Sequence, residues 1–454
     1  MTTEEYLSQL IAGARAAQAE FSTYSQEKVN AAVRAVGKAV YDNAELLARM
    51  AVDETGMGRY EDKVQKCRGK SKSVWYRIKD AKSRGIIERN DLDGIVKVAK
   101  PIGVIGAITP TTNPVITPMH NSMMALKGGN AIIICPHPRA KKCGAKTVAL
   151  INEALAALGM PAHLIQYIEE PSLELSAGVM RMADACISTG GAAMVKSAYS
   201  SGKPAYGVGA GNVQCLVDRD VDFAEVAPMI VAGRIFDNGI LCTCEQSIHC
   251  PREKCGEMVK ALTDNGAYYI SDDAQAEALR NAAFPDGMLN KDFVGASVEK
   301  IARMAGLDIP EGVKTIVCKT KGIAYDDVLA KEKMFPVLAL FPYDTWEEGV
   351  ANAQANLAME GMGHSVVLHS HDDSHIEYAT GIINVSRYLV NQVGSTGLGG
   401  AFDNGLNPTT TLGCGTWGNN SISENLWFYH LINISRIAYR IPDTRIPTDE
   451  EIWG

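Results

Sequence analysis

The segment DNGILCTCEQS, residues 237–247, holds the residue whose type and setting best suit covalent chemistry. Cys242 follows a glycine-bearing loop and is flanked by polar residues, where a core strand would have a continuous apolar run. A thiolate attacks a carbonyl carbon and then carries the acyl group as a thioester, which divides one difficult step into two easier ones. The alternative is a cysteine packed as a small apolar side chain, which is the commoner fate of this residue type.

The same region contains five residues of types that bind metals. They are Cys242, Cys244, His249, Cys250 and Cys255. Structural zinc sites usually contain two knuckles in which a short, regular spacing separates the paired ligands. A C-x-C pair followed by adjacent His and Cys does not have that spacing. The sequence therefore favours a nucleophile over a metal site, and we expect no metal.

The segment GAITPTTNPVITP, residues 106–118, could stabilise an oxyanion. Negative charge that develops on a carbonyl oxygen is best stabilised by fixed donors in a dry site, such as a side-chain amide and a backbone N–H. Asn113 lies between a threonine and a proline and could be that donor. An asparagine before proline is also a common turn residue, so a purely structural role is the alternative.

A third segment, ISTGGAAMVKSA at residues 187–198, has the pattern of a strand, a glycine turn and the start of a helix. Backbone N–H groups at a helix N-terminus bind phosphate, so a dinucleotide pyrophosphate could lie beside residues 188–191. The G-x-G-x-x-G fingerprint is absent, and the pattern is weak by itself. The later run GVGAGN, residues 207–212, enters a strand instead of a helix and does not fit a phosphate loop.

Stretches of helical and strand periodicity separate these segments. Thr2 and Glu5 have the capping-box spacing that begins a helix. Further helical stretches are expected from about 25 to Gly56, at 140–158 and at 223–236. Apolar strands at 131–135, 164–168 and 185–189 alternate with helices, which predicts βαβ units and a parallel sheet. After the turn at Asp93-Gly94, the β-rich residues 95–98 and 104–105 indicate a hairpin.

Length and composition limit the classes of protein to which this chain can belong. A chain of 454 residues with 46% hydrophobic content can bury a large core and favours two or three α/β domains. The net charge of −8 is mixed along the chain, which argues against a nucleic-acid partner. The long uncharged stretch at 101–126 is rich in proline and polar residues and does not indicate a membrane span. Eleven irregularly spaced cysteines and the lack of a signal-like N-terminus lead us to expect a cytoplasmic protein with reduced thiols.

Several of these segments together resemble the CoA-acylating branch of the aldehyde dehydrogenase superfamily, including the aldehyde dehydrogenase half of bifunctional aldehyde-alcohol dehydrogenases. The resemblance covers nearly the whole chain. The segments that carry it are ITPTTNP, ICPHPRAKK, STGG, SSGKPAYGVGAGN, FDNGILCTCEQS, KEKMFPV and TLGCGTWGNNSISENL. It implies an α/β fold with a Rossmann-like cofactor domain, an α/β catalytic domain and a small β oligomerisation element. The expected ranges are 1–220, 221–412 and 413–454, with about 88–106 adding a hairpin to the oligomerisation element.

The resemblance also implies residue roles. Cys242 matches the nucleophile and Asn113 the oxyanion-hole amide. His364, in GMGHS, matches a histidine that could assist proton transfer at the CoA thiol; a structural histidine in a glycine turn is the alternative. Hydrolytic relatives hold the adenosine ribose with a lysine and a glutamate, whose places here are Cys135 and Pro138. The expected cofactor-binding residues are Thr109, Pro110, Thr111, Cys135, His137, Arg139, Ser188, Thr189, Gly190, Gly191, Gly209 and Glu332, the last matching the glutamate on the nicotinamide ribose.

One departure from the hydrolytic relatives predicts the acyl acceptor. Those enzymes have a glutamate general base at the place of Gly207, and a glycine cannot activate water. We therefore expect the thioester to persist until coenzyme A, a better nucleophile, takes the acyl group in a reversible reaction. NAD and NADP both remain open, because Arg139, Lys141 and Lys142 could neutralise a 2′-phosphate or simply be solvated.

The substrate is expected to be a short aldehyde. The stretches YDNAELLARMAVDETGMGRYEDKV and FDNGLNPTTTLGCGTWG and the ending EEIWG are most similar to CoA-dependent succinate-semialdehyde dehydrogenases, while Asn419 stands where some of those enzymes have arginine. Sulfoacetaldehyde, acetaldehyde and propionaldehyde are alternatives. Candidate residues for an anionic tail are Thr243, Ser395, Thr396, Asn404 and Thr410. A homodimer or larger homo-oligomer is expected. The alternative classes are a hydrolytic aldehyde dehydrogenase and a non-catalytic zinc-binding scaffold.

Overall fold

The computed structural model describes residues 2–442 and 444–454. Its first part is a layer of helices, with α1 at Thr3–Phe21, α2 at Gln26–Asp42, α3 at Ala44–Thr55 and α4 at Tyr60–Ile78. The predicted capping box is confirmed: the Thr2 hydroxyl accepts from the Glu5 N–H at 3.2 Å, and the Glu5 carboxylate accepts from the Thr2 N–H at 2.7 Å. The helical stretch after residue 25 ends at Gly56, whose φ of +66° suits glycine.

A five-stranded parallel sheet follows, in the order β5-β4-β3-β6-β7. Its strands are β3 (Val104–Thr109), β4 (Ala131–Pro136), β5 (Ile165–Tyr167), β6 (Ala185–Thr189) and β7 (Ala205–Val208). The connecting helices are α5 (Ile116–Lys127), η1 (Pro138–Ala140), α6 (Lys141–Ala157), α7 (Leu173–Met182) and α8 (Ala192–Tyr199). The strand order reverses between β3 and β6, and ligands of such sheets bind where the carboxyl ends of the strands meet that point.

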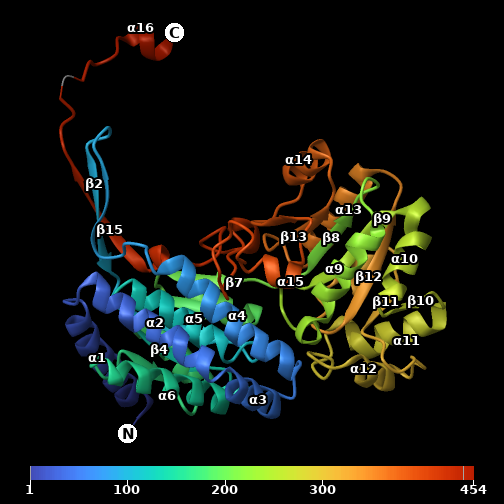
Figure 1. The fold of residues 1–454 in the computed structure, drawn as a ribbon, viewed down its shortest axis with the longest axis horizontal. Helices are drawn as coiled ribbons and strands as arrows, with labels where there is room; N and C mark the ends of the chain where they lie inside the picture. Colours follow the sequence, from blue (N-terminus) through green and yellow to red (C-terminus); the bar gives the residue numbers. More distant parts are fainter. Residues whose placement is uncertain (1, 443) are drawn as a thin grey trace.

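The second sheet has seven strands in the order β10-β11-β12-β9-β8-β13-β14. The strands are β8 (Val213–Val217), β9 (Glu245–Pro251), β10 (Ala267–Ile270), β11 (Thr315–Lys319), β12 (Val337–Tyr343), β13 (Val366–His369) and β14 (Tyr388–Val390). The α-helices around it are α9 (Phe223–Ile235), α10 (Cys255–Asp264), α11 (Asp273–Ala283), α12 (Val298–Ala305), α13 (Trp346–Met359), α14 (Asp373–Ile382) and α15 (Gly394–Gly397). Short 3-10 helices are η2 (Phe236–Gly239), η3 (Arg252–Lys254), η4 (Pro285–Gly287), η5 (Ala324–Asp326), η6 (Val328–Ala330), η7 (Thr416–Gly418) and η8 (Phe428–Leu431). Both sheets pack between helices, which confirms the α/β prediction (Figure 1).

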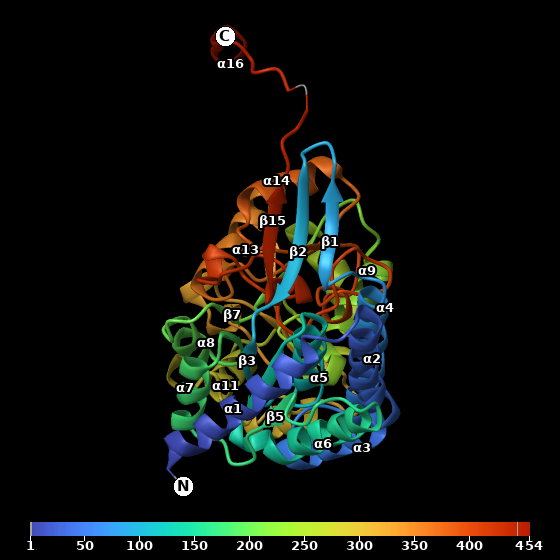
Figure 2. The same ribbon diagram turned by 90° about the vertical axis from the view of Figure 1, so that its left-hand side faces the viewer.

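A three-stranded antiparallel sheet projects from the body as an arm (Figures 1 and 2). It consists of β1 (Gly85–Asn90), β2 (Ile95–Pro101) and β15 (Ile432–Ala438), in the order β1-β2-β15. Beyond β15 the chain extends farther from the body and carries the short helix α16 (Asp449–Trp453) at its end. The hairpin predicted between 95–98 and 104–105 is wrong. The hairpin is β1-β2, and β3 leaves the arm to enter the parallel sheet, because Gly103 turns the chain with a φ of +135°.

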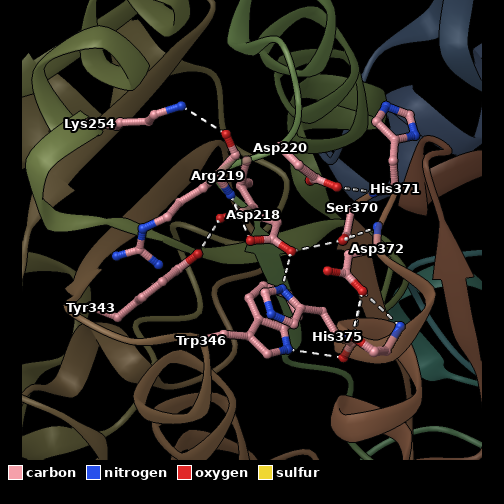
Figure 3. A network of polar contacts seen from close by, with 12 residues as sticks. Asp218, Arg219, Asp220, Lys254, Tyr343, Trp346, Ser370, His371, Asp372 and His375 are labelled. Atoms are coloured by element: carbon pink, nitrogen blue, oxygen red, sulfur yellow. Dashed lines mark hydrogen bonds and ion pairs between the residues drawn. The ribbon is translucent and has the colours of Figure 1, made fainter.

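A polar network lies at the carboxyl ends of two neighbouring strands of the seven-stranded sheet (Figure 3). Asp218 follows β8 directly, and its carboxylate accepts hydrogen bonds from the Ser370 hydroxyl at 2.8 Å and the His375 ring at 2.6 Å. The Trp346 indole donates to the His375 carbonyl at 2.9 Å. The network thereby joins the ends of β8 and β13 to helices α13 and α14.

No helix in the part of the chain that the structure describes is both long enough and apolar enough to cross a membrane.

Candidate active site

One cavity of about 220 Å³ brings together residues from distant parts of the chain. Its wall includes helix α4, the turn before α5, the loop before β9 and the loops between α15 and residue 412. Two of the three predicted catalytic residues, Cys242 and Asn113, line it. Four of the five predicted substrate-binding residues line it as well: Thr243, Ser395, Thr396 and Thr410.

The Cys242 thiol occupies the loop between η2 and β9 and is partly buried. Burial raises the pKa of this thiol well above its usual value, and the charge of Glu332 raises it further, while Arg387 acts in the opposite direction. The resting side chain is therefore a neutral thiol at pH 7. Because the thiolate is the nucleophile, a base must take up this proton before the thiol can attack.

Glu332 lies beside the Cys242 backbone, next to Gly211. Its carboxylate accepts a hydrogen bond from the Gly211 N–H at 3.0 Å. A Cβ atom on Gly211 would overlap the Cys242 carbonyl oxygen and lie 2.6 Å from Glu332 Oε1, so only glycine lets these three residues meet. Burial and the nearby Glu360 raise the pKa of Glu332 to about 7. Such a group exchanges a proton readily near neutral pH.

The Asn113 amide is oriented by Lys66 of helix α4. The Lys66 ammonium donates to Asn113 Oδ1 at 2.7 Å and also forms an ion pair with the buried Asp237, which Lys63 contacts at 3.0 Å. Because the amide oxygen accepts from Lys66, the NH₂ group is left as a donor for a ligand. Lys66 was missed in the sequence. The available signal was the spacing of Lys63, Lys66 and Lys70, which places three cations along one face of a helix.

Two predicted residues lie elsewhere. The Asn404 side chain is used within its own loop: it donates to the Gln392 side chain and the Gly397 carbonyl, both at 3.1 Å, and accepts from the Ala401 and Leu406 N–H groups. The Cys135 thiol is completely buried and contacts the Ser176 hydroxyl at 3.1 Å. Its side chain therefore cannot reach a ligand at the edge of the sheet.

His364 also lies outside the wall of the cavity. Its ring is fully buried, and neither ring nitrogen has a hydrogen-bond partner among the described residues. Burial and the nearby Arg387 lower the pKa of His364 well below its usual value, so the ring is neutral. A role of His364 in proton transfer stays a prediction.

The sequence and the fold were compared with known proteins. The aldehyde dehydrogenase family model matches residues 1–304. A succinate-semialdehyde dehydrogenase (acetylating) from Clostridium kluyveri is 51% identical over 454 residues, which cover 100% of both chains. The chain belongs to the aldehyde dehydrogenase family. A sulfoacetaldehyde dehydrogenase from Acholeplasma sp is 39% identical over 97% of this chain and 92% of that one. The crystal structure of an acetylating aldehyde dehydrogenase from Geobacillus thermoglucosidasius superposes with a TM-score of 0.94 at 34% identity, covering 98% of each chain.

This aldehyde dehydrogenase is therefore an oxidoreductase that acts on aldehyde groups. Most of its predicted cofactor residues lie at the carboxyl ends of β3, β4, β6 and β7, whereas Glu332 lies before β12 and contacts Gly211. Thr109 and Ser188 lie at the ends of adjacent strands, and His137 and Arg139 follow the neighbouring β4. Pro110 and Thr111 continue from β3, and Gly209 continues from β7.

The glycine turn fits a dinucleotide. The Ser188 hydroxyl is buried and lacks a partner among the described residues. A Cβ on Gly191 would meet open space, and a Cβ on Gly190 would just touch Met194. Gly191 caps α8 without a side-chain hydrogen bond, which leaves backbone N–H groups free for phosphate. Lys141 forms an ion pair with Glu170 at 2.5 Å, whereas Arg139 and Lys142 are exposed.

The position of Gly207 leaves no room for a general base in this aldehyde dehydrogenase. A Cβ atom there would lie 2.6 Å from Val195 Cγ1 and 3.0 Å from the Tyr199 ring. The Gly207 N–H also donates to the Tyr199 hydroxyl at 2.8 Å. Helix α8 thus closes off the place where a glutamate would stand in hydrolytic relatives.

A zinc-binding scaffold would need a cluster of metal-ligating side chains. Within residues 2–442 and 444–454, no three His, Cys, Asp or Glu side chains are grouped so that they could hold a metal ion. Cys250 and Cys255 contact each other, but Cys242 lines the cavity and His249 Nε2–H donates to Gln214 Oε1 at 2.9 Å.

Proposed function

We propose that this aldehyde dehydrogenase reversibly oxidises succinate semialdehyde with coenzyme A and NAD(P)⁺, giving succinyl-CoA and NAD(P)H through a thioester on Cys242. The observation that carries the proposal is that Cys242 and the Lys66-oriented amide of Asn113 open into one cavity. The closed position of Gly207 supports coenzyme A over water as the acceptor of the acyl group.

The side chains account for the steps at the carbonyl carbon. Glu332 takes up the Cys242 proton, the sulfur adds to the aldehyde, and the Asn113 amide donates to the oxyanion that forms. When bound, NAD(P)⁺ supplies the acceptor for the hydride that this carbon releases. Cys242 then carries the acyl group as a thioester, and the thiol of coenzyme A displaces it. The last step exchanges one thioester for another, so the reaction runs in both directions.

The lining of the cavity supports an anionic aldehyde. The hydroxyls of Ser395 and Thr410 are buried without partners among the described residues, and Thr243 donates to the Ser395 carbonyl at 3.2 Å. Both curated relatives described above are named for aldehydes that carry an anionic group. Sulfoacetaldehyde is therefore the second candidate, ahead of acetaldehyde and propionaldehyde. Asn419 does not line the cavity.

The test follows NAD(P)H absorbance with succinate semialdehyde, sulfoacetaldehyde, acetaldehyde and propionaldehyde in turn, each with and without coenzyme A. We expect steady turnover only with coenzyme A and the highest kcat/KM with succinate semialdehyde. Without coenzyme A, we expect a burst of one NAD(P)H per Cys242, because the thioester persists. Steady turnover without coenzyme A would show that water accepts the acyl group and would overturn the acylating mechanism.

The proposal also covers the oligomeric state of the protein and its cellular compartment. We infer that the projecting arm joins copies of this chain into a homo-oligomer, since Leu92 at its tip and Ile446 and Trp453 beyond it are more than four-fifths exposed. The eleven cysteines are all unpaired, which fits a reducing cytoplasm.

A further inference from the structure

Three lysines follow one face of helix α4, and among the described residues one of them has no carboxylate partner. Lys63 and Lys66 both form ion pairs with Asp237. Lys70, one turn farther along, lines the cavity, and no carboxylate among the described residues lies within 4.0 Å of its ammonium. Its ammonium donates a hydrogen bond to the Gly399 carbonyl at 2.8 Å.

This arrangement is unfavourable in the absence of a ligand. An ammonium group that loses water without gaining a counter-charge is destabilised, and burial alone lowers the pKa of Lys70 to about 8. The neighbouring His120 is neutral and offers no compensating charge, because burial lowers its pKa to about 3. At pH 7 Lys70 is still mostly protonated, so the cavity contains an uncompensated cation.

Two hydroxyl donors share the cavity with this cation. Ser395 Oγ and Thr410 Oγ1 are buried and lack partners among the described residues. The Lys70 bond to Gly399 attaches the ammonium to the same stretch of chain that carries both hydroxyls. One ammonium and two hydroxyl donors match the needs of a carboxylate, whose two oxygens accept several hydrogen bonds.

We propose that Lys70 determines substrate specificity: its ammonium binds the anionic end of a short aldehyde, and the hydroxyls of Ser395 and Thr410 donate to the same group. This inference rests on the proposed function and names the residue that selects the charged substrate. A carboxylate and a sulfonate share the required chemistry, and the experiment separates them.

The test compares Lys70→Met and Lys70→Arg with wild type, using succinate semialdehyde, sulfoacetaldehyde and the uncharged butyraldehyde at saturating coenzyme A. Lys72→Met is the matched control, since Lys72 lies on the same helix but is exposed and outside this cavity. We expect Lys70→Met to lower kcat/KM for the preferred anionic aldehyde roughly 10- to 100-fold, mainly by raising KM. The kcat/KM for butyraldehyde should change less than about 3-fold. Lys70→Arg should retain most of the preference for anionic aldehydes over butyraldehyde.

A second measurement does not depend on turnover. Succinate should slow the alkylation of Cys242 by iodoacetamide in wild type and in Lys72→Met, and this protection should be lost in Lys70→Met. The Tm of Lys70→Met should equal or exceed that of wild type, because a methionine removes an uncompensated, partly buried charge. A mainly structural lysine would give a lower Tm.

The outcomes separate the two proposals. If wild type prefers anionic aldehydes and Lys70→Met keeps the same preference and the same protection by succinate, the role of Lys70 is overturned and the proposed function stands. If wild type prefers butyraldehyde to both anionic aldehydes, the proposed substrate is wrong. If succinate nevertheless protects Cys242 in wild type and not in Lys70→Met, the anion-binding site at Lys70 is still supported. Loss of protection in Lys72→Met as well would count against a specific site.

Discussion

The amide of Asn113 can act as an oxyanion donor only if its NH₂ group faces the cavity, and Lys66 holds it that way. Asn113→Ala should lower kcat by roughly 10²- to 10³-fold with a small change in KM. Lys66→Met should lower kcat by about 10-fold or more, because the amide is then free to turn.

Steady-state kinetics with the double variant tests this coupling. Since both changes act on one donor, the double variant should be no slower than Asn113→Ala alone. Losses that multiply would mean that Lys66 acts on the reaction independently of Asn113.

The pH dependence of Cys242 should report Glu332. Only the ionised form of Glu332 can accept the thiol proton, and burial raises the pKa of Glu332 to about 7. Alkylation of Cys242 by iodoacetamide in the cofactor-free enzyme should therefore slow as the pH falls below about 7. In Glu332→Gln this slowing should move to higher pH, because only the thiol, whose pKa burial raises, then titrates. An identical pH profile in both proteins would exclude Glu332 as the base.

The sequence allowed us to predict Cys242 and Asn113 because each stands in an unusual local segment. Lys66 and Lys70 could not be found in the same way, since a lysine on a polar helix normally faces solvent. Their roles depend on Asp237 and Gly399, which are 171 and 329 positions away. The direction of the Cys135 side chain could not be predicted for a related reason: the alternation of the strand turns its thiol toward helix α7, where Ser176 lies.

Three strands of the five-stranded sheet and helix α9 beside the second sheet could be predicted, because their periodicity is local. The strand expected at 185–189 is β6 with the same bounds, and the helix expected at 223–236 is α9, ending one residue earlier. Periodicity could not predict the pairing in the arm, because the partner of β2 is β15, more than 300 positions later, and only the resemblance placed both segments in one element. A pairing over that distance leaves no pattern in one sequence.

The network around Asp218, at the ends of β8 and β13, should make the stability of the protein depend on pH. Burial acts to lower the pKa of His375, but the hydrogen bond and the charge of Asp218 outweigh it and raise that pKa. A raised pKa in the folded state stabilises the protein below the unfolded value of about 6.5, and this contribution is lost as the pH rises through the folded value.

His375→Gln should therefore lower Tm more at pH 6 than at pH 8.5. The difference is expected to be small, because the His375 side chain is 38% exposed and water screens the pair. Thermal unfolding at the two pH values checks this, with the exposed His371→Gln as the control. An equal loss at both pH values would mean that the charge of His375 does not contribute.

The arm gives the molecule a large projecting surface. If it joins copies of the chain, removal of residues 439–454 takes away the exposed Ile446 and Trp453 and should reduce the mass of the assembly. Light scattering coupled to size exclusion measures this directly. A truncated protein with the mass of the full-length assembly would place the interface elsewhere.

The catalytic cavity is assembled from four places along the chain: Lys66, Asn113, Cys242 and the loop that carries Thr410. A ribosome builds these places one after another, so the nucleophile emerges long before the wall that will surround it. Until Thr410 has been synthesised and has entered the fold, this part of the wall is missing, and the thiol of Cys242 lacks the shelter that the finished cavity gives it.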